Sequence, residues 1–136
     1  MAESAHDYAE RIRKEARHAY QRLTSLLNDG ANAIRCIDEN THGGGTMVAG
    51  SILFFYYYGL IRDYFAAKAA QGINSVHIVL HFYCGFLFAV VGLVTIDSQR
   101  DYIAGAKIMI ESVASEYGIT VTWEIDPNGS ARPHMS

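Results

Sequence analysis

The sequence predicts a predominantly all-α protein: a two-span transmembrane helical hairpin, flanked by cytoplasmic helices and followed by one short C-terminal β-strand. Two observations lead to this fold class. Residues 40–61 and 69–96 contain no Asp, Glu, Lys or Arg, although the chain has 136 residues. Half of all residues are hydrophobic and only 18% are charged, against a usual charged fraction of about a quarter.

The strongest candidate span is 76–96, which reads VHIVLHFYCGFLFAVVGLVTI. A helix of about 21 residues is roughly 31 Å long, close to the thickness of the hydrocarbon core of a bilayer. The segment is apolar on every side, so as a helix it must be buried. A chain of 136 residues offers little protein to surround it. Burial in lipid is therefore expected.

Residues 1–42 are expected to form amphipathic, coiled-coil-like helices. Ser4 and Asp7 match a capping box at the start of a helix over Ala5–Asn28. Its apolar positions recur in steps of four and three, which is a heptad pattern. A shorter helix is expected over Ala31–Glu39, followed by a glycine-rich hinge at 40–45.

Residues 43–97 are expected to form the hairpin, with spans at about 46–61 and 76–96. Six Lys or Arg residues precede the first span, two lie between the spans and three follow the second. The positive-inside rule then places both termini in the cytoplasm and the bend outside. The expected localisation is a multi-pass membrane protein whose partners are the bilayer and either further copies or another membrane protein.

Residues 98–126 are expected to form an amphipathic helix followed by a strand, and 127–136 a disordered tail. Alternation over 119–126 is typical of a half-buried strand. No second strand is apparent for it to pair with. Val121, Trp123 and Ile125 are therefore candidates for pairing with another chain, the alternative being a strand folded back on the helix through Trp123.

Three residues are candidate metal ligands: His77, His81 and Cys84. On a helix they would share one face, although the first and last would be about 10.5 Å apart along the axis. At most two could therefore hold one ion. No cofactor is expected, with metal or haem at His77 and His81 as the alternative to histidines of purely structural role.

Small residues offer a second candidate interface. Helices in lipid approach closely where such residues line up. They could mediate self-association or docking on a partner, or only close the hairpin within one chain. The positions are Gly85, Ala89 and Gly92 in the second span and Ala49 and Gly50 in the first.

Several functions are disfavoured by the sequence. It has no GxSxG or HExxH motif and no paired carboxylates in the apolar segments, so no enzymatic activity is expected. A formal charge of −3 gives no support for nucleic-acid binding. The expected role is a small non-catalytic integral membrane protein that self-assembles or serves as an accessory subunit. The alternatives are a holin-like pore and a soluble helical bundle that binds an apolar ligand or assembles as an oligomer.

Overall fold

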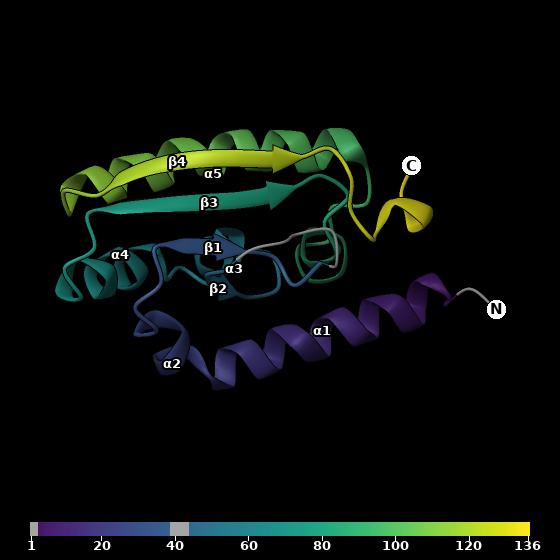
Figure 1. Ribbon diagram of the computed structural model, residues 1–136. Helices are drawn as coiled ribbons and strands as arrows, with labels where there is room; N and C mark the ends of the chain where they lie inside the picture. Colours follow the sequence, from purple (N-terminus) through teal and green to yellow (C-terminus); the bar gives the residue numbers. More distant parts are fainter. Residues whose placement is uncertain (1–2, 39–43) are drawn as a thin grey trace.

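The computed structural model describes residues 3–38 and 44–136. These residues contain both helices and strands, interspersed along the chain (Figure 1). In chain order the elements are α1 (Ala5–Gln21), α2 (Leu23–Leu27), β1 (Ala33–Arg35), β2 (Thr46–Met47), α3 (Ile52–Tyr57), α4 (Ile61–Ala70), β3 (Ser75–His81), the π-helical turn η1 (Leu87–Val91), α5 (Ile96–Glu116), β4 (Thr120–Asp126) and the 3₁₀ turn η2 (Arg132–His134).

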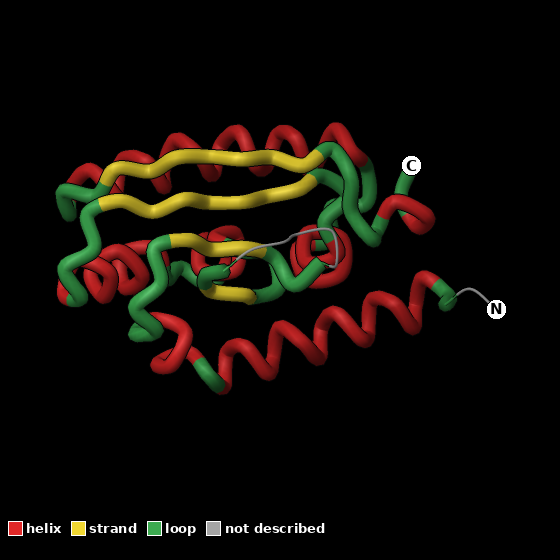
Figure 2. Tube along the Cα trace, in the orientation of Figure 1, coloured by secondary structure: helices red, strands yellow, loops and turns green. Residues whose placement is uncertain are grey.

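The strands form one four-stranded parallel sheet in the order β2-β1-β3-β4. β3 pairs with β4 along its whole length, from Ser75 opposite Thr120 to His81 opposite Asp126. All carboxyl ends therefore lie at one end of the sheet, as the arrowheads of β1, β3 and β4 show in Figure 1, and Figure 2 traces the strands side by side. From β1 the chain first adds β2 on one side, then returns to add β3 and β4 on the other. The carboxyl ends of β1 and β3 thus border a topological switch point.

The helices hold the sheet in place. α3, α4 and α5 contact one another, and α5 also packs against β4, whereas α1 lies along η1. The start of α1, η1 and the C-terminal segment gather beside the carboxyl ends of the strands (Figure 1). Residues 127–136, expected to be a disordered tail, include η2 and the fully buried Ala131.

The predicted transmembrane hairpin is wrong. Within 3–38 and 44–136, no helix combines the length and apolarity needed to cross a bilayer. The described chain has an α/β fold rather than an all-α one. The multi-pass localisation, the cytoplasmic termini and the roles as membrane subunit or pore lose their basis with it. Burial of the apolar segment in protein, assumed in the alternative of a soluble helical bundle, fits better, although the surrounding fold is not a bundle.

The apolar composition of 76–96 is explained by burial in the protein core rather than by a membrane span. Its first part is β3, an internal strand, in which Ile78, Val79 and Leu80 are all at most 2% exposed. An internal strand of a parallel sheet is covered on both faces, so it is continuously apolar, like a membrane helix. The rest of the segment turns through η1 and reaches the start of α5.

Two further elements differ from expectation. The segment 46–61 contains β2, α3 and the first residue of α4 rather than one span. The expected helix over 31–39 contains β1 instead, and the expected hinge at 40–45 lies largely outside the described residues. Ser4 does cap α1 as expected, accepting a hydrogen bond from the Asp7 N–H, but α1 ends at Gln21.

Candidate metal centre

Four side chains that could bind a metal ion or accept a proton beside it lie at or just after the carboxyl ends of β1 and β3. Cys36 comes directly after β1, and Asp38 lies two residues further on. His81 is the last residue of β3, and Cys84 follows it after a short turn. The parallel sheet brings these ends together at the switch point, which is where open α/β sheets usually bind their ligands.

Cys36, His81 and Cys84 form a compact buried cluster. Their possible ligand atoms, two Sγ and one imidazole nitrogen, all lie within 4.8 Å of one another. The three residues are 4%, 3% and 2% exposed. A tetrahedral zinc ion holds such atoms roughly 3.3–3.8 Å apart, so a modest closing movement would complete the geometry. Two sulfurs and one imidazole are a donor set that suits zinc.

The His81 imidazole is oriented as a ligand would be. Its Nδ1 lies 2.9 Å from the Phe82 carbonyl oxygen. Because a carbonyl can only accept, Nδ1 carries a proton, and Nε2 is the atom that could offer a lone pair to a cation after losing its own proton. Nε2 is buried without a hydrogen-bond partner among the described residues. The nearest carboxylate atom that the structure gives for it is Asp38 Oδ2, at 3.9 Å.

The cluster shifts the pKa values of its two cysteines in opposite directions. A hydrogen bond from Cys36 lowers the pKa of the Cys84 thiol despite burial, helped by the backbone N–H groups of Leu87 and Phe86. The hydrogen bond with Cys84, together with burial, raises the pKa of Cys36 well above its usual value. Burial acts to lower the pKa of His81, but the adjacent Cys36 side chain outweighs it and raises that pKa to about 9. Without metal, the cluster thus retains protons that a cation would displace.

Outer contacts fix the two cysteines. The fully buried Gln99 side chain binds both backbone groups of Cys84: its Oε1 accepts from the N–H at 2.8 Å and its Nε2 donates to the carbonyl at 3.1 Å. The Gly50 N–H donates to Cys36 Sγ at 3.3 Å. Such second-shell contacts commonly orient metal ligands.

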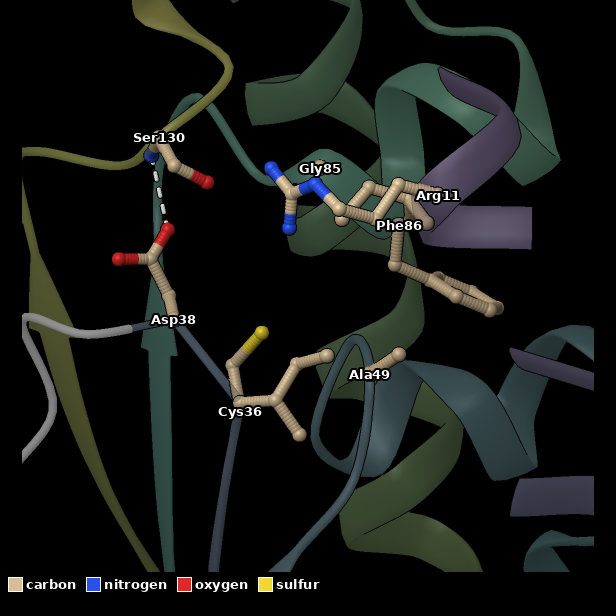
Figure 3. A pocket seen from close by; sticks show the side chains of 9 residues that line it. Arg11, Cys36, Asp38, Ala49, Gly85, Phe86 and Ser130 are labelled. Carbon is tan, nitrogen blue, oxygen red and sulfur yellow. Dashed lines mark hydrogen bonds between the residues drawn. The ribbon is translucent and has the colours of Figure 1, made fainter. Parts of the chain in front are cut away.

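A small cavity of about 40 Å³ opens beside the cluster. Cys36 Sγ, the Asp38 carboxylate and the Arg11 guanidinium face it in Figure 3, and Arg11 reaches it from α1. The Ser130 N–H donates to Asp38 Oδ2 at 2.7 Å, and the Ser130 hydroxyl shares a hydrogen bond of 2.8 Å with the Tyr8 hydroxyl. The C-terminal segment and α1 therefore complete the wall around Asp38.

The structure brings together two of the three predicted ligands. His77 lies four residues before His81 on a strand, a separation of about 13 Å rather than one helical turn. It contacts β4 instead, with Nδ1 2.7 Å from Thr122 Oγ1. Cys36 was missed because it fell in an expected helix. Its signal was the spacing Cys36-x-Asp38 after a short apolar segment and before a glycine-rich one.

Two of the five predicted small-residue positions, Gly85 and Gly50, lie in close approaches within the chain. A Cβ on Gly85 would overlap the Tyr8 hydroxyl, and one on Gly50 would lie 2.6 Å from the Phe86 ring. The carbonyl of Ala89 accepts from Arg13 Nε at 3.0 Å. Ala49 lies in the core, and Gly92 ends η1 with a φ of 87°.

The predicted partner strand is β4. Its residues Val121, Trp123 and Ile125 are half-buried, and Trp123 Nε1 donates to Glu111 of α5 at 2.7 Å. Contrary to expectation, β4 has a strand partner within the chain, β3.

Comparisons with family models, with curated proteins and with solved structures find no match.

Proposed function

We propose that this protein is a zinc enzyme that adds water to a small uncharged electrophile, with carbon dioxide as the substrate. One observation carries the proposal: the buried His81 Nε2 has no hydrogen-bond partner among the described residues and belongs to a cluster with two cysteine sulfurs. A buried polar atom without a partner is costly. Binding of a cation at this position would remove that cost.

The donor set supports a catalytic rather than a closed site. Cys36, His81 and Cys84 offer three ligands, which is the number typical of catalytic zinc. Zinc held by these three residues would supply a bound water of lowered pKa, and so hydroxide near neutral pH. The cavity beside Cys36 would give a small substrate access to the cluster.

Asp38 and Arg11 have complementary roles in this proposal. The Asp38 carboxylate faces the cavity and is held by the Ser130 N–H, so it can accept a proton from the attacking water and orient it. The Arg11 guanidinium stacks on Tyr8, with its Cζ 5.2 Å from the ring centroid. A cation at the cavity favours an anionic product, as bicarbonate would be.

The cavity limits the size of the substrate. An enclosed water needs about 10–15 Å³ of such space, so a volume of about 40 Å³ accommodates a molecule of only about three heavy atoms. Side chains of Ile12, Ala49 and Phe86 give part of the wall an apolar character. Carbon dioxide fits the size of this cavity, is uncharged as its apolar wall requires, and has a carbon atom that hydroxide can attack.

The metal is tested first. The purified protein is expected to contain one zinc ion per chain by plasma mass spectrometry. His81→Ala and Cys84→Ser are expected to lose it. His77→Ala is the matched control, since it removes a histidine from the same strand outside the cluster, and should retain zinc. A wild-type protein that binds no zinc after reconstitution would overturn the proposal.

The reaction is tested by stopped-flow hydration of carbon dioxide with a pH indicator. Zinc-loaded protein should accelerate hydration, and Asp38→Asn should keep zinc but lose about 10²–10⁴-fold in turnover, the range for loss of a general base. Asp97→Asn, an exposed carboxylate with 88% of its side-chain surface accessible, serves as the control. Stoichiometric zinc without hydration activity would show a structural metal site and reject the enzymatic role.

A further inference from the structure

The outer edge of β4 has unused hydrogen-bonding groups at regular positions. On the inner side, Thr120 N–H donates to Asn74 and Asp126 accepts from Phe82 N–H, both at 2.9 Å. In a parallel ladder the backbone N–H and C=O groups of successive residues point alternately toward and away from the neighbouring strand. Thr120, Thr122, Glu124 and Asp126 therefore bond to β3. The N–H and C=O groups of Val121, Trp123 and Ile125 point outward, where the structure gives no strand within the described residues.

We propose that a second copy of this chain pairs with this edge, β4 against β4 in antiparallel orientation, with the two-fold axis at Trp123. In this register Trp123 pairs with Trp123 of the second copy, and Val121 pairs with Ile125 in both directions. All three outward donors and all three outward acceptors of each copy are then satisfied. This proposal is independent of the proposed zinc chemistry, because none of these residues belongs to the metal centre.

Charge selects this register over its neighbours. Centred on Trp123, the intervening pairs are Thr122 with Glu124 and Thr120 with Asp126, and no like charges face each other. Centred on Glu124, two carboxylates would lie directly opposite, which is destabilising. Centred on Thr122, the strands overlap less and Ile125 faces Ile119, beyond the end of the partner's β4.

The adjoining surface of α5 fits a second copy as well. A groove of about 410 Å³ runs between α5 and Ile125 and is lined by Lys107, Ile108 and Glu111. Val121 of the second copy, placed opposite Ile125 and on the same face, would enter it. Ile108 is 75% exposed, the most of any large apolar residue among those described.

The charges on α5 also complement each other. Lys107 and Glu111 both lie near Trp123: Lys107 Nζ is 5.2 Å from the ring centroid and Glu111 accepts from Nε1. A two-fold axis at Trp123 brings the two α5 helices together antiparallel near Ile108. Lys107 of one copy then approaches Glu111 of the other, and the two Ile108 side chains approach across the axis.

The oligomeric state is the first test. Light scattering coupled to gel filtration should give twice the chain mass of 15.1 kDa. Ile108→Lys, a change at an exposed position, should give the monomer. Met109→Lys is the matched control: it lies on the same helix, is 41% exposed and is not a lining residue of the groove. It should remain dimeric.

The register is tested by a second set of variants. Val121→Pro removes an outward N–H while sparing the β3 ladder, so circular dichroism should be unchanged and the dimer lost. The double variant Thr122→Cys, Glu124→Cys should form a covalent dimer under mild oxidation, because non-hydrogen-bonded antiparallel pairs bring Cα atoms to about 4.5 Å. Either single variant should not. A wild-type monomer at 100 μM, a dimer unaffected by Ile108→Lys, or cross-linking of Thr122→Cys alone would each overturn the proposal.

Discussion

At the scale of single residues, Gly129 determines whether the C-terminal segment can lie against the metal centre. A Cβ at this position would overlap the Phe82 carbonyl oxygen and His81 Nδ1, the two atoms that fix the imidazole. Gly129→Ala should therefore cost about 1–3 kcal/mol of unfolding free energy, as overpacking does, and weaken zinc binding. Urea denaturation and competition with a chelator measure the two effects.

Gly105→Ala is the matched control for this change. Gly105 lies within α5, and a Cβ there would meet no atom within 4 Å. Replacing a helical glycine by alanine should stabilise the protein by about 0.5–1 kcal/mol and leave zinc binding unchanged. Equal zinc affinity in Gly129→Ala and wild type would show that the segment does not support the imidazole.

The candidate metal ligands could be predicted only in part from the sequence. Both His81 and Cys84 were identified as possible ligands from residue type alone. Their spacing was then interpreted on a helix, which grouped them with His77 instead of Cys36. The ligand set could not be found without the strand assignment, because a strand places His77 and His81 about 13 Å apart. The third ligand, Cys36, directly follows β1, a strand of only three residues.

At the scale of elements, a strand could be recognised from the sequence only where one of its faces is exposed to solvent. β4 was predicted over 119–126 because Thr120, Thr122 and Glu124 are exposed and alternate with half-buried residues. β3 was missed because both of its faces are covered, which removes the alternation. α1 was recognised by its cap at Ser4 and its apolar spacing. Local signals therefore sufficed for α1 and β4, which have a solvent-facing side, and failed for the internal strand β3.

One ion pair links two elements at the far end of the sheet. Lys68 of α4 is 0% exposed, and its Nζ lies 2.7 Å from Oδ1 of Asp29, which precedes β1. Asp29→Asn would leave the ammonium buried without its counter-charge, and we expect a loss of about 3–5 kcal/mol at pH 7. The double variant Asp29→Asn, Lys68→Met should recover most of it. Asp97→Asn, at an exposed site, should cost under about 1 kcal/mol.

The same pair predicts the pH dependence of stability. Burial acts to raise the pKa of Asp29, but the hydrogen bonds from Lys68, Thr46 and the Ala31 N–H outweigh it, so the folded-state pKa lies below the usual 3.8. A depressed carboxyl pKa stabilises the fold above the unfolded-state value, and this contribution is lost as pH falls through the folded-state value. Denaturation of wild type and Asp29→Asn should therefore converge below pH 3.8. A constant difference down to pH 2 would contradict this origin.

At the scale of the whole molecule, the candidate centre joins parts of the chain that are distant in sequence. Cys36 follows β1, His81 ends β3 and Cys84 precedes η1, while α1 and the C-terminal segment enclose Asp38. None of these neighbours follows from local patterns. They follow from strand order, because β1 and β3 are adjacent only after β2 has been placed on the outer side. Sequence motifs of contiguous catalytic residues could not reveal such a site.

A metal held by ligands from separate segments should stabilise the entire fold. Binding to the folded state alone adds about 4.1 kcal/mol when free zinc is 1,000 times its dissociation constant. For a chain of 136 residues this corresponds to a rise in Tm of more than about 10 °C. Differential scanning calorimetry with zinc and after removal by a chelator measures it. His77→Ala should show the wild-type difference and His81→Ala almost none, because only the second change removes a ligand. An equal Tm with and without zinc would mean that Cys36, His81 and Cys84 do not coordinate one ion together.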